Sequence, residues 1–501
     1  MSKFNQFIIM EGEICLRANR EFGLNKYTKP EICGLPTADE LRKSLASGEN
    51  SAVRNQLADL FDVASFVEIG AYVKRGFSDF LATEKSNEFE GVICGYGAID
   101  GKLAFAFAED ASRMGGVIDE RHAKKIADLY SLAIKNGAPV VGIFNSNGTD
   151  IFAGTAGLAA YGKIMATVNS ASGVIPQIAY VTGKCIGLSS AIAAMFDFTV
   201  KANDSELYVS SPALTGAADA QNSLVAFSGD STQCAGYIRN LVSYLPMNAD
   251  SGVFVESCTD NLNRMLGELD FAGDARSVIA TVADNGVFYE VGSEFAPAVV
   301  TAFATIGGVR AAIVVNSFNS NEGRIDAACA RKISRFVNFC GSFMIPVVTL
   351  VDSNGLVIDK SNEVNFFAPE LAKLAVAYTS CNAPKITVII GHAIGAAFVL
   401  LGSKALGADI VYCTDDAEVC ALPAESGVAF AWDKYITLEQ SRESLIEVWR
   451  AEVSSPARAA ASGEIDDIIS TNELRARICS ALLMLSAKGQ NAIIGSKVLP
   501  L

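Results

Sequence analysis

The sequence contains few of the side chains on which most enzymes rely for proton transfer and metal binding. Only two histidines occur in 501 residues, His122 and His392, and no G-x-S-x-G motif is present. The twelve cysteines never form a Cys-x-x-Cys pair. These absences argue against a Ser-His-Asp hydrolase and against zinc-finger or histidine-rich metal sites. We expect no bound metal. His122 is interpreted as a packing or surface residue, and for His392, in a glycine turn, ligand contact is the minority interpretation.

Basic residues, and charged residues in general, are also scarce. The chain has 40 Lys and Arg against 55 Asp and Glu, a formal net charge of −15. Such a field repels phosphate backbones, which argues against nucleic-acid binding. Only 19% of the residues are charged while 50% are hydrophobic, so much surface must be buried inside domains or between subunits. At this length two domains are expected rather than one.

Signals for export and for membrane insertion are missing or weak. Residues 1–6 show no basic stretch followed by an apolar one, and scattered cysteines are typical of reduced thiols, so the expected location is the cytoplasm. The run 386–403 contains no Asp, Glu, Lys or Arg and is about as long as the shortest membrane span. A buried strand, a glycine turn and a helix from Ala396 is the favoured alternative, because a second copy of the run carries Lys184 in its turn. No membrane span is expected.

That second copy belongs to an internal repeat. The stretch Pro139-Val-Val-Gly-Ile-Phe-Asn-Ser-Asn-Gly148 returns 207 residues later as Pro346-Val-Val-Thr-Leu-Val-Asp-Ser-Asn-Gly355. The segment 116–126 matches 323–333 at the same offset, and 176–187 matches 384–395 at an offset of 208. A spacing this constant indicates a tandem duplication.

Each copy predicts the order β–α–β–α. The strands are apolar throughout, which is typical of parallel strands buried on both faces of an α/β sheet. A hairpin is expected at 95–101, where Asp-Gly is a turn signal, and the flanks 36–62 and 437–488 are expected to be helical. The predicted strands are 103–108, 140–144 and 178–181 in the first copy and 311–315, 347–351 and 386–390 in the second, with helices at 123–133 and 327–336.

Glycine-containing turns follow two strands in each copy. In α/β sheets ligands bind at the carboxyl ends of the strands. Glycine lets backbone N–H groups approach a ligand closely, and free N–H groups at a helix start stabilise an oxyanion. The duplication therefore predicts two backbone oxyanion holes, and the alternative is a set of tight structural turns.

At these residues the sequence resembles the carboxyltransferase subunits of biotin-dependent acyl-CoA carboxylases and decarboxylases, which are propionyl-CoA carboxylase β-like proteins. The resemblance runs nearly end to end and rests on motifs in a fixed order. They are Gly91-Val-Ile-Cys-Gly-Tyr-Gly, His122-Ala-Lys-Lys-Ile and Ala171-Ser-Gly-Val-Ile-Pro-Gln-Ile in the first half, and Asp274-Ala-Arg-Ser-Val-Ile, Ile345-Pro-Val-Val-Thr-Leu-Val-Asp and Ser403-Lys-x-Leu-Gly-Ala-Asp in the second.

The resemblance implies an α/β protein built as a tandem duplication of two crotonase-like (ClpP/crotonase) spiral domains. Residues 1–255 would form the acyl-CoA side and 256–501 the biotin side. The implied reaction moves a carboxyl group between carboxybiotin and the α-carbon of a coenzyme A thioester. The ureido anion left by CO₂ release takes the α-proton, and the thioester becomes an enolate that attacks CO₂. Backbone N–H groups would stabilise both the ureido anion and the enolate.

The family also implies partners. Biotin would arrive on a separate biotin carboxyl carrier protein, because the biotin-accepting Met-Lys-Met is absent from this chain. Biotin carboxylase or decarboxylase-complex subunits are expected as further partners. The expected assembly is a hexamer, and a hexamer that includes a paralogous subunit is the alternative. The apolar composition favours burial of surface between subunits.

Carried over residue by residue, the resemblance implies the site. The acyl-CoA oxyanion hole falls on Gly187 and Leu188, and the biotin hole on Ala396 and Ala397. Lys184 is not carried over from the family: it is the nearest cation by sequence to the first of these turns, so it is a candidate for binding the coenzyme A phosphates, and a solvated surface lysine is the equally favoured alternative. The other expected substrate-binding residues are Asn147, Gly148, Asn354, Gly355 and Gly395.

The chain departs from the family pattern chiefly in the first half. Leu188 and Ala396 replace the second glycine of each pair, and the segment after Ser211-Pro212 is short. A positive φ at Leu188 would cost about 1 kcal/mol, and its side chain would enter the pocket. The alternative to an active subunit is therefore a catalytically degenerate paralogue that assembles with an active one. A crotonase-type hydratase ranks third, because it would use acidic side chains and would not require a second domain.

Overall fold

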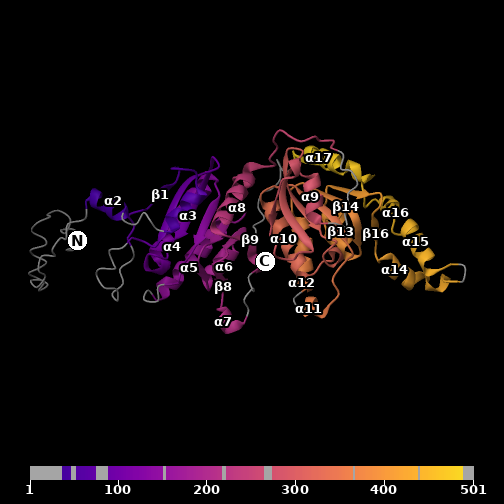
Figure 1. Cartoon of the computed structure of the whole chain (residues 1–501), viewed down its shortest axis with the longest axis horizontal. Coiled ribbons are helices and arrows are strands. Elements are labelled where there is room, and N and C mark those ends of the chain that lie inside the picture. Colours follow the sequence, from indigo (N-terminus) through magenta and orange to yellow (C-terminus); the bar gives the residue numbers. More distant parts are fainter. Residues whose placement is uncertain are drawn as a thin grey trace, which may run out of the picture. The chain divides into compact units, whose positions relative to one another are not determined.

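The computed structural model describes residues 37–46, 52–74, 89–149, 154–216, 222–264, 274–364, 367–437 and 440–488. The chain divides into two units, Met1–Asn50 and Ser51–Leu501. In the first unit the described structure is helix α2 (Ala38–Ala46), which lies in the flank expected to be helical. The second unit contains both copies of the repeat (Figure 1).

The first copy forms a mixed sheet of seven described strands in the order β1-β2-β3-β4-β5-β7-β9. Pairing is antiparallel from β1 to β3 and parallel from β3 onward. The hairpin expected at 95–101 is confirmed, because the tight turn at Asp100-Gly101 joins β2 to β3 and makes this edge of the sheet antiparallel. The repeated strands β3, β4 and β5 pair in parallel, as expected. The strands are β1 (Val67–Ile69), β2 (Val92–Ile99), β3 (Lys102–Glu109), β4 (Val140–Phe144), β5 (Gln177–Val181), β7 (Phe198–Ala202) and β9 (Val225–Gly229).

The second copy repeats this sheet in the order β10-β11-β12-β13-β14-β15-β17, with β16 paired to β14. Strands β12, β13 and β14 correspond to β3, β4 and β5. A separate parallel pair, β6 (Lys184–Ile186) and β8 (Glu206–Tyr208), lies in the first copy. The strands of the second sheet are β10 (Phe288–Val291), β11 (Val299–Ile306), β12 (Val309–Asn316), β13 (Val347–Ser353), β14 (Lys385–Ile394), β15 (Ile410–Thr414), β16 (Glu418–Cys420) and β17 (Asp467–Ile469).

The helices also repeat. Helices α4 and α10 both begin at a capping aspartate: the Asp119 side chain accepts the N–H of His122, and the Asp326 side chain accepts the N–H of Cys329. The described helices of the second unit are α3 (Ala52–Leu60), α4 (Glu120–Asn136), α5 (Thr155–Ala171), α6 (Leu188–Ala194), α7 (Pro212–Thr215), α8 (Ser231–Tyr244), α9 (Ala275–Val282), α10 (Ala327–Ser342), α11 (Lys360–Val364), α12 (Phe367–Ser380), α13 (Ala396–Leu400), α14 (Ala424–Gly427), α15 (Arg442–Glu452), α16 (Pro456–Ala461) and α17 (Leu474–Leu485).

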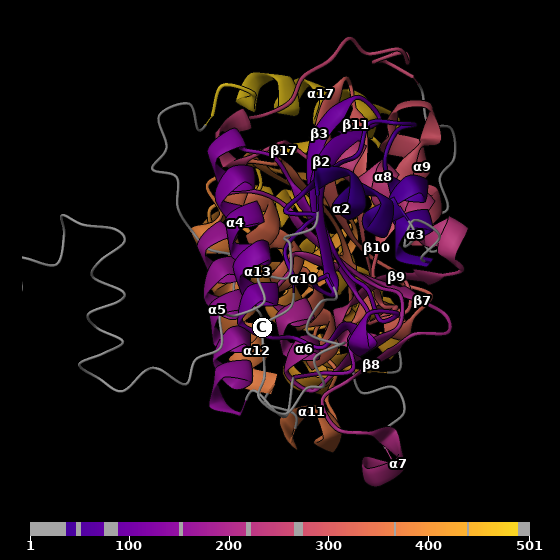
Figure 2. The same ribbon diagram turned by 90° about the vertical axis from the view of Figure 1, so that its left-hand side faces the viewer.

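Helices cover both faces of each sheet because the strands are apolar on both. In β4, Val140 and Phe144 belong to the core under α4 and α5, whereas Val141 and Ile143 belong to the core under α3 and α8. Figure 2 shows α4 and α5 on one side of the first sheet and α3 and α8 on the other. In the second sheet α10 and α12 cover one face, and α9 and α17 cover the other.

The two halves share one of these cores. The Phe198 ring of the first sheet lies 4.7 Å from Phe339 on α10 and 6.0 Å from Phe303 on β11, measured between ring centroids. The face of the first sheet covered by α3 and α8 therefore packs against the α10 face of the second. Val255 already pairs with Val309 of the second sheet. The domain division at 255 and 256 stays a prediction.

The apolar run 386–403 folds as the buried strand β14, a turn at Gly395 and the short helix α13. This arrangement agrees with the strand-turn-helix interpretation. Among the helices of the described residues, none is long and apolar enough to cross a membrane.

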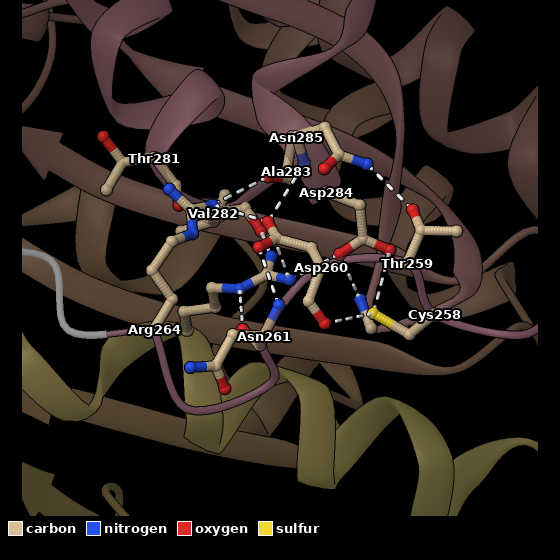
Figure 3. Close-up of polar contacts among 12 residues, drawn as sticks. Cys258, Thr259, Asp260, Asn261, Arg264, Thr281, Val282, Ala283, Asp284 and Asn285 are labelled. Carbon is tan, nitrogen blue, oxygen red and sulfur yellow. Dashed lines mark hydrogen bonds and ion pairs between the residues drawn. The ribbon is translucent and has the colours of Figure 1, made fainter.

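A buried ion-pair network joins α17 to the rest of the second half. Arg475 on α17 is completely buried, and its guanidinium contacts the carboxylate of Asp284 and, at 3.4 Å, that of Asp260. Asp284 also accepts the N–H groups of Gly307 and Gly308, each at 2.8 Å, in the turn between β11 and β12. Figure 3 shows how the segment around Asp260 meets the segment around Asp284. The network therefore ties α17, the last of the described helices, to the β11–β12 turn of the second sheet.

Candidate active site

The turns after β4 and β13 have the same backbone geometry. Ile118 donates its N–H to Gly148 O, and Ile325 donates to Gly355 O, both at 2.9 Å. The N–H groups of the turn itself are also engaged: Gly148 donates to Ser146 Oγ at 3.1 Å, and Gly355 to Ser353 Oγ at 3.3 Å. Because these N–H groups are already hydrogen-bonded, the turns can line a site but cannot donate these N–H groups to a ligand.

The same holds for the asparagines of these turns. Asn147 donates its N–H to Gly115 O at 2.9 Å, and Asn354 donates to Glu322 O at 3.1 Å. The Asn354 side chain reaches further and donates to Glu322 Oε2 at 3.0 Å. Contact of Asn147, Gly148, Asn354 and Gly355 with substrates stays a prediction, and it would have to use side chains, carbonyl groups or close packing.

Gly187 and Gly395 form the second pair of turns, immediately before α6 and α13. Their φ angles are +60° and +57°, a region that glycine adopts without strain. Each also has its N–H occupied, by Tyr208 O at 3.0 Å in the first half and by Cys420 O at 2.8 Å in the second. The N–H of Gly187 is therefore not available to a ligand in this structure, and the role of Gly187 is to set the turn.

The open donors are the next residues along. Leu188 and Ala396 are the first helical residues, whose N–H groups have no acceptor within the helix. The repeat makes Ser189 the equivalent of Ala397. Leu188 is not among the residues with positive φ, so the backbone strain expected there is absent. Its side chain is 47% exposed, so it points at least partly away from the packed interior.

Backbone contacts bring the two turns of each half together. In the first half, Ser146 donates its N–H to Lys184 O at 2.8 Å, and Lys184 donates its N–H to Asn145 Oδ1 at 3.2 Å. In the second half, His392 donates its N–H to Asp352 Oδ1 at 2.8 Å. A Cβ at Gly183 or Gly391 would lie within 2.4 Å of those side-chain oxygens, so this approach requires glycine.

Charged side chains differ between the two sites. Lys184 is exposed in the first. In the second, His392 Nδ1 lies 2.9 Å from Asp352 Oδ1, and this hydrogen bond raises the pKa of His392 while burial opposes the shift. Hydrogen bonds from Arg324 and Asn354 hold the pKa of Glu322 below its usual value.

A buried polar cluster supports the first turn from behind. Glu109 accepts the N–H of Asn145 at 2.8 Å, and burial raises the pKa of Glu109 to about 7, while His122 opposes the rise. His122 is fully buried, with Nδ1 at 3.5 Å from Glu90 Oε1 and Nε2 at 3.9 Å from Glu109 Oε1. It is thus a packing residue, as interpreted from its sequence position. Within the described ranges, no group of three or more His, Cys, Asp or Glu could hold a metal ion.

Sequence reasoning did not single out Ser189, Asn145 or Asp352. The offsets of the repeat would have identified the first, because Ser189 stands 208 residues before Ala397. Asn145 and Asp352 stand 207 residues apart within the repeat and accept the N–H groups of Lys184 and His392. That contact depends on two strands lying side by side, so only the fold reveals it.

Comparisons with known proteins find similarity over nearly the whole chain. A family model described as the carboxyl transferase domain matches residues 45–497. The chain is 34% identical to the methylmalonyl-CoA decarboxylase subunit alpha of Veillonella parvula, over 90% of this chain and 93% of that protein. It is 32% identical to the human mitochondrial propionyl-CoA carboxylase beta chain, over 87% of this chain and 85% of that protein.

Solved structures are also similar to this chain over more than nine tenths of its length. The chain is similar to transcarboxylase 12S, described as a hexamer with methylmalonyl-CoA bound, with a TM-score of 0.85 and 28% identity over 93% of this chain and 99% of that one. A single-chain, multi-domain long-chain acyl-CoA carboxylase shares the fold, with a TM-score of 0.74 at 20% identity over 94% of this chain and 49% of that one.

Proposed function

This chain belongs to the carboxyl transferase family, with a duplicated crotonase-like fold, and we propose that it is an active subunit. The family's activity is biotin-dependent carboxyl transfer involving acyl-CoA. We propose a short substrate of the propionyl-CoA or methylmalonyl-CoA kind, because both names occur among the relatives. The observation that carries the proposal is the duplicated turn, with open N–H groups after Gly187 and after Gly395.

We propose that the second-half turn receives biotin. Carboxybiotin, brought by a separate carrier protein in the cytoplasm, would supply the carboxyl group and a ureido base for the α-proton. Ala396 and Ala397 fit a ureido oxygen, because their N–H groups lie at the start of α13 and their side chains stop at Cβ. These two donors would stabilise negative charge on that oxygen.

We propose that the first-half turn receives the thioester. Leu188 and Ser189 would present their N–H groups to the thioester oxygen and stabilise the enolate that forms on proton loss. The Gly187 of the predicted pair would shape this turn, since its own N–H binds Tyr208 O. The same donors serve carboxylation and decarboxylation, because both directions pass through the same enolate. No histidine or metal is needed in this scheme.

Lys184 gives the first prediction. Lys184 follows β5 and lies beside the turn that holds Asn147, because its carbonyl accepts the N–H of Ser146 at 2.8 Å. Its side chain is exposed, and its charge would attract coenzyme A phosphates to a chain of net charge −15. Lys184→Ala should weaken acyl-CoA binding about tenfold, the effect of losing a charged hydrogen bond. Calorimetry on the assembled protein measures this. Lys135→Ala is the matched control, because Lys135 is exposed at the far end of α4. Equal affinities in both variants would contradict a phosphate role for Lys184.

Assembly gives the second prediction. We propose a hexamer, as described for transcarboxylase 12S. Large apolar side chains are unusually exposed in the single chain: Ile358 at 94%, Leu214 at 87% and Phe430 at 86%. Exposed apolar surface of this kind favours burial between subunits. Light scattering should give six times the chain mass at micromolar concentration, and a stable monomer would contradict the proposal.

A further inference from the structure

His392 is held on two sides at the carboxyl edge of the second sheet. Its Nδ1 lies 2.9 Å from Asp352 Oδ1, and its ring stacks on Phe318 with centroids 4.9 Å apart and planes at 21°. An ionised carboxylate only accepts hydrogen bonds, so the proton of this contact sits on Nδ1. Nε2 therefore remains for a ligand, and the side chain is 34% exposed.

The position of His392 places it beside the proposed biotin turn. It stands three residues before Gly395, in the part of β14 that pairs with β16. The neighbouring turn is close as well, because a Cβ at Gly355 would lie 3.4 Å from Ile394 O. The end of β14 and the turn after β13 thus meet at His392.

The other charged groups near His392 are already paired. Glu418 lies opposite His392 in the β14–β16 register and binds Arg450 at 2.7 Å. Glu322 lies in the short turn Asn321–Gly323 after β12, accepts a hydrogen bond from the Asn354 side chain and binds Arg324 at 2.7 Å. These arginines are occupied by carboxylates, whereas His392 keeps one ring nitrogen open after binding Asp352.

The duplicated position in the first half differs in one respect. Lys184 and His392 both donate a backbone N–H to the side chain of the preceding strand's turn, to Asn145 and to Asp352. The first half has a lysine at this position, and the second half has a histidine, the side chain whose charge changes near neutral pH. Asp352 chiefly raises the pKa of His392; burial opposes this, Glu418 adds to it and Arg450 reduces it. The imidazolium is present below that raised pKa and is lost as the pH rises through it.

We propose that His392 determines specificity in the second-half site by donating from Nε2 to the carboxylate of the incoming N-carboxylated ureido group. This inference rests on the proposed function. Carboxylated and uncarboxylated biotin share the ureido oxygen that Ala396 and Ala397 would bind, and they differ by one negative charge. A charge-assisted donor beside that oxygen favours the carboxylated form and releases the uncarboxylated one.

The test uses the assembled protein, an acyl-CoA and a biotin carrier protein that has been carboxylated enzymatically. KM for the carboxylated carrier and KM for acyl-CoA are measured separately from about pH 6 to pH 8.5, around the ordinary histidine pKa. His392→Ala should raise KM for the carrier about tenfold at the acid end and leave KM for acyl-CoA unchanged. In the wild type, KM for the carrier should rise with pH. His392→Lys should keep KM for the carrier low and make it independent of pH over this range, because lysine, the residue at the equivalent position of the first half, also donates from a cation.

Arg442→Ala provides the control, because it removes an exposed cation of the same half that pairs with Asp433. Light scattering confirms assembly of each variant. If the wild type transfers carboxyl groups but its carrier KM is insensitive to pH and to His392→Ala, the inference is wrong and the proposed function stands. If the assembled wild type transfers nothing, both are overturned.

Discussion

Ala396→Pro is expected to lower the rate of carboxyl transfer by about 10²–10³-fold, the usual effect of losing one oxyanion-hole donor. Proline lacks the N–H that would stabilise the ureido oxygen. Ala396 is the first residue of α13, where proline is well tolerated because no helical hydrogen bond is lost. The substitution therefore removes the donor with little effect on the fold. Ala396→Gly keeps the N–H and should keep most of the activity.

The first half offers the same experiment at Leu188. This residue begins α6, so Leu188→Pro should also reduce kcat by about 10²–10³-fold. Leu188→Ala retains the donor and should stay active. Rates are compared at saturating acyl-CoA and saturating carboxylated carrier. Proline variants as active as their controls, in properly assembled protein, would mean that these N–H groups do not stabilise the reacting anions.

Arg475→Met is expected to destabilise the second half by about 3–5 kcal/mol, the usual cost of breaking a buried ion pair from one side. The substitution leaves the buried carboxylate of Asp284 without its cation, whereas Asp260 keeps Arg264 at 3.1 Å. Asp284 also holds the turn at Gly307 and Gly308. Urea unfolding followed by circular dichroism should show a much lower midpoint for this variant.

Arg477→Met on the same helix is the matched control for Arg475. Arg477 is 42% exposed and lies 3.3 Å from Asp467, and exposed ion pairs contribute only about 0–1 kcal/mol. Its unfolding midpoint should stay close to that of the wild type. Similar midpoints for the two variants would contradict the structural importance of the buried network.

The repeat made much of the fold predictable. Strand β4 has the bounds expected from its sequence, and β13 extends two residues beyond its expected end. Apolar runs bounded by glycine identify such buried strands well. The antiparallel strands β1 and β10 were not predicted, because both are short and half-buried and carry little apolar signal. Which strands pair at a sheet edge depends on contacts that a local pattern does not contain.

The candidate site was predictable to the level of its turns. Sequence and resemblance placed Gly187 and Gly395 at helix starts, which the structure confirms. They did not indicate that the N–H of Gly187 is taken by Tyr208 O, because that contact comes from the separate pair β6–β8. The expected strain at Leu188 was wrong, since Gly187 alone carries the positive φ. Backbone hydrogen bonds between distant segments therefore decide which donors remain open.

Transfer of a radiolabelled carboxyl group tests the central claim most directly. The assembled wild-type protein is mixed with a biotin carrier protein carrying labelled carboxybiotin and with propionyl-CoA, and label in the acyl-CoA product is measured over time. An active subunit predicts label that depends on both substrates and falls sharply in Ala396→Pro and Leu188→Pro. An assembled wild-type oligomer that binds the carrier but transfers no label, to propionyl-CoA or to other short acyl-CoA substrates, would contradict the account and favour a catalytically degenerate partner subunit.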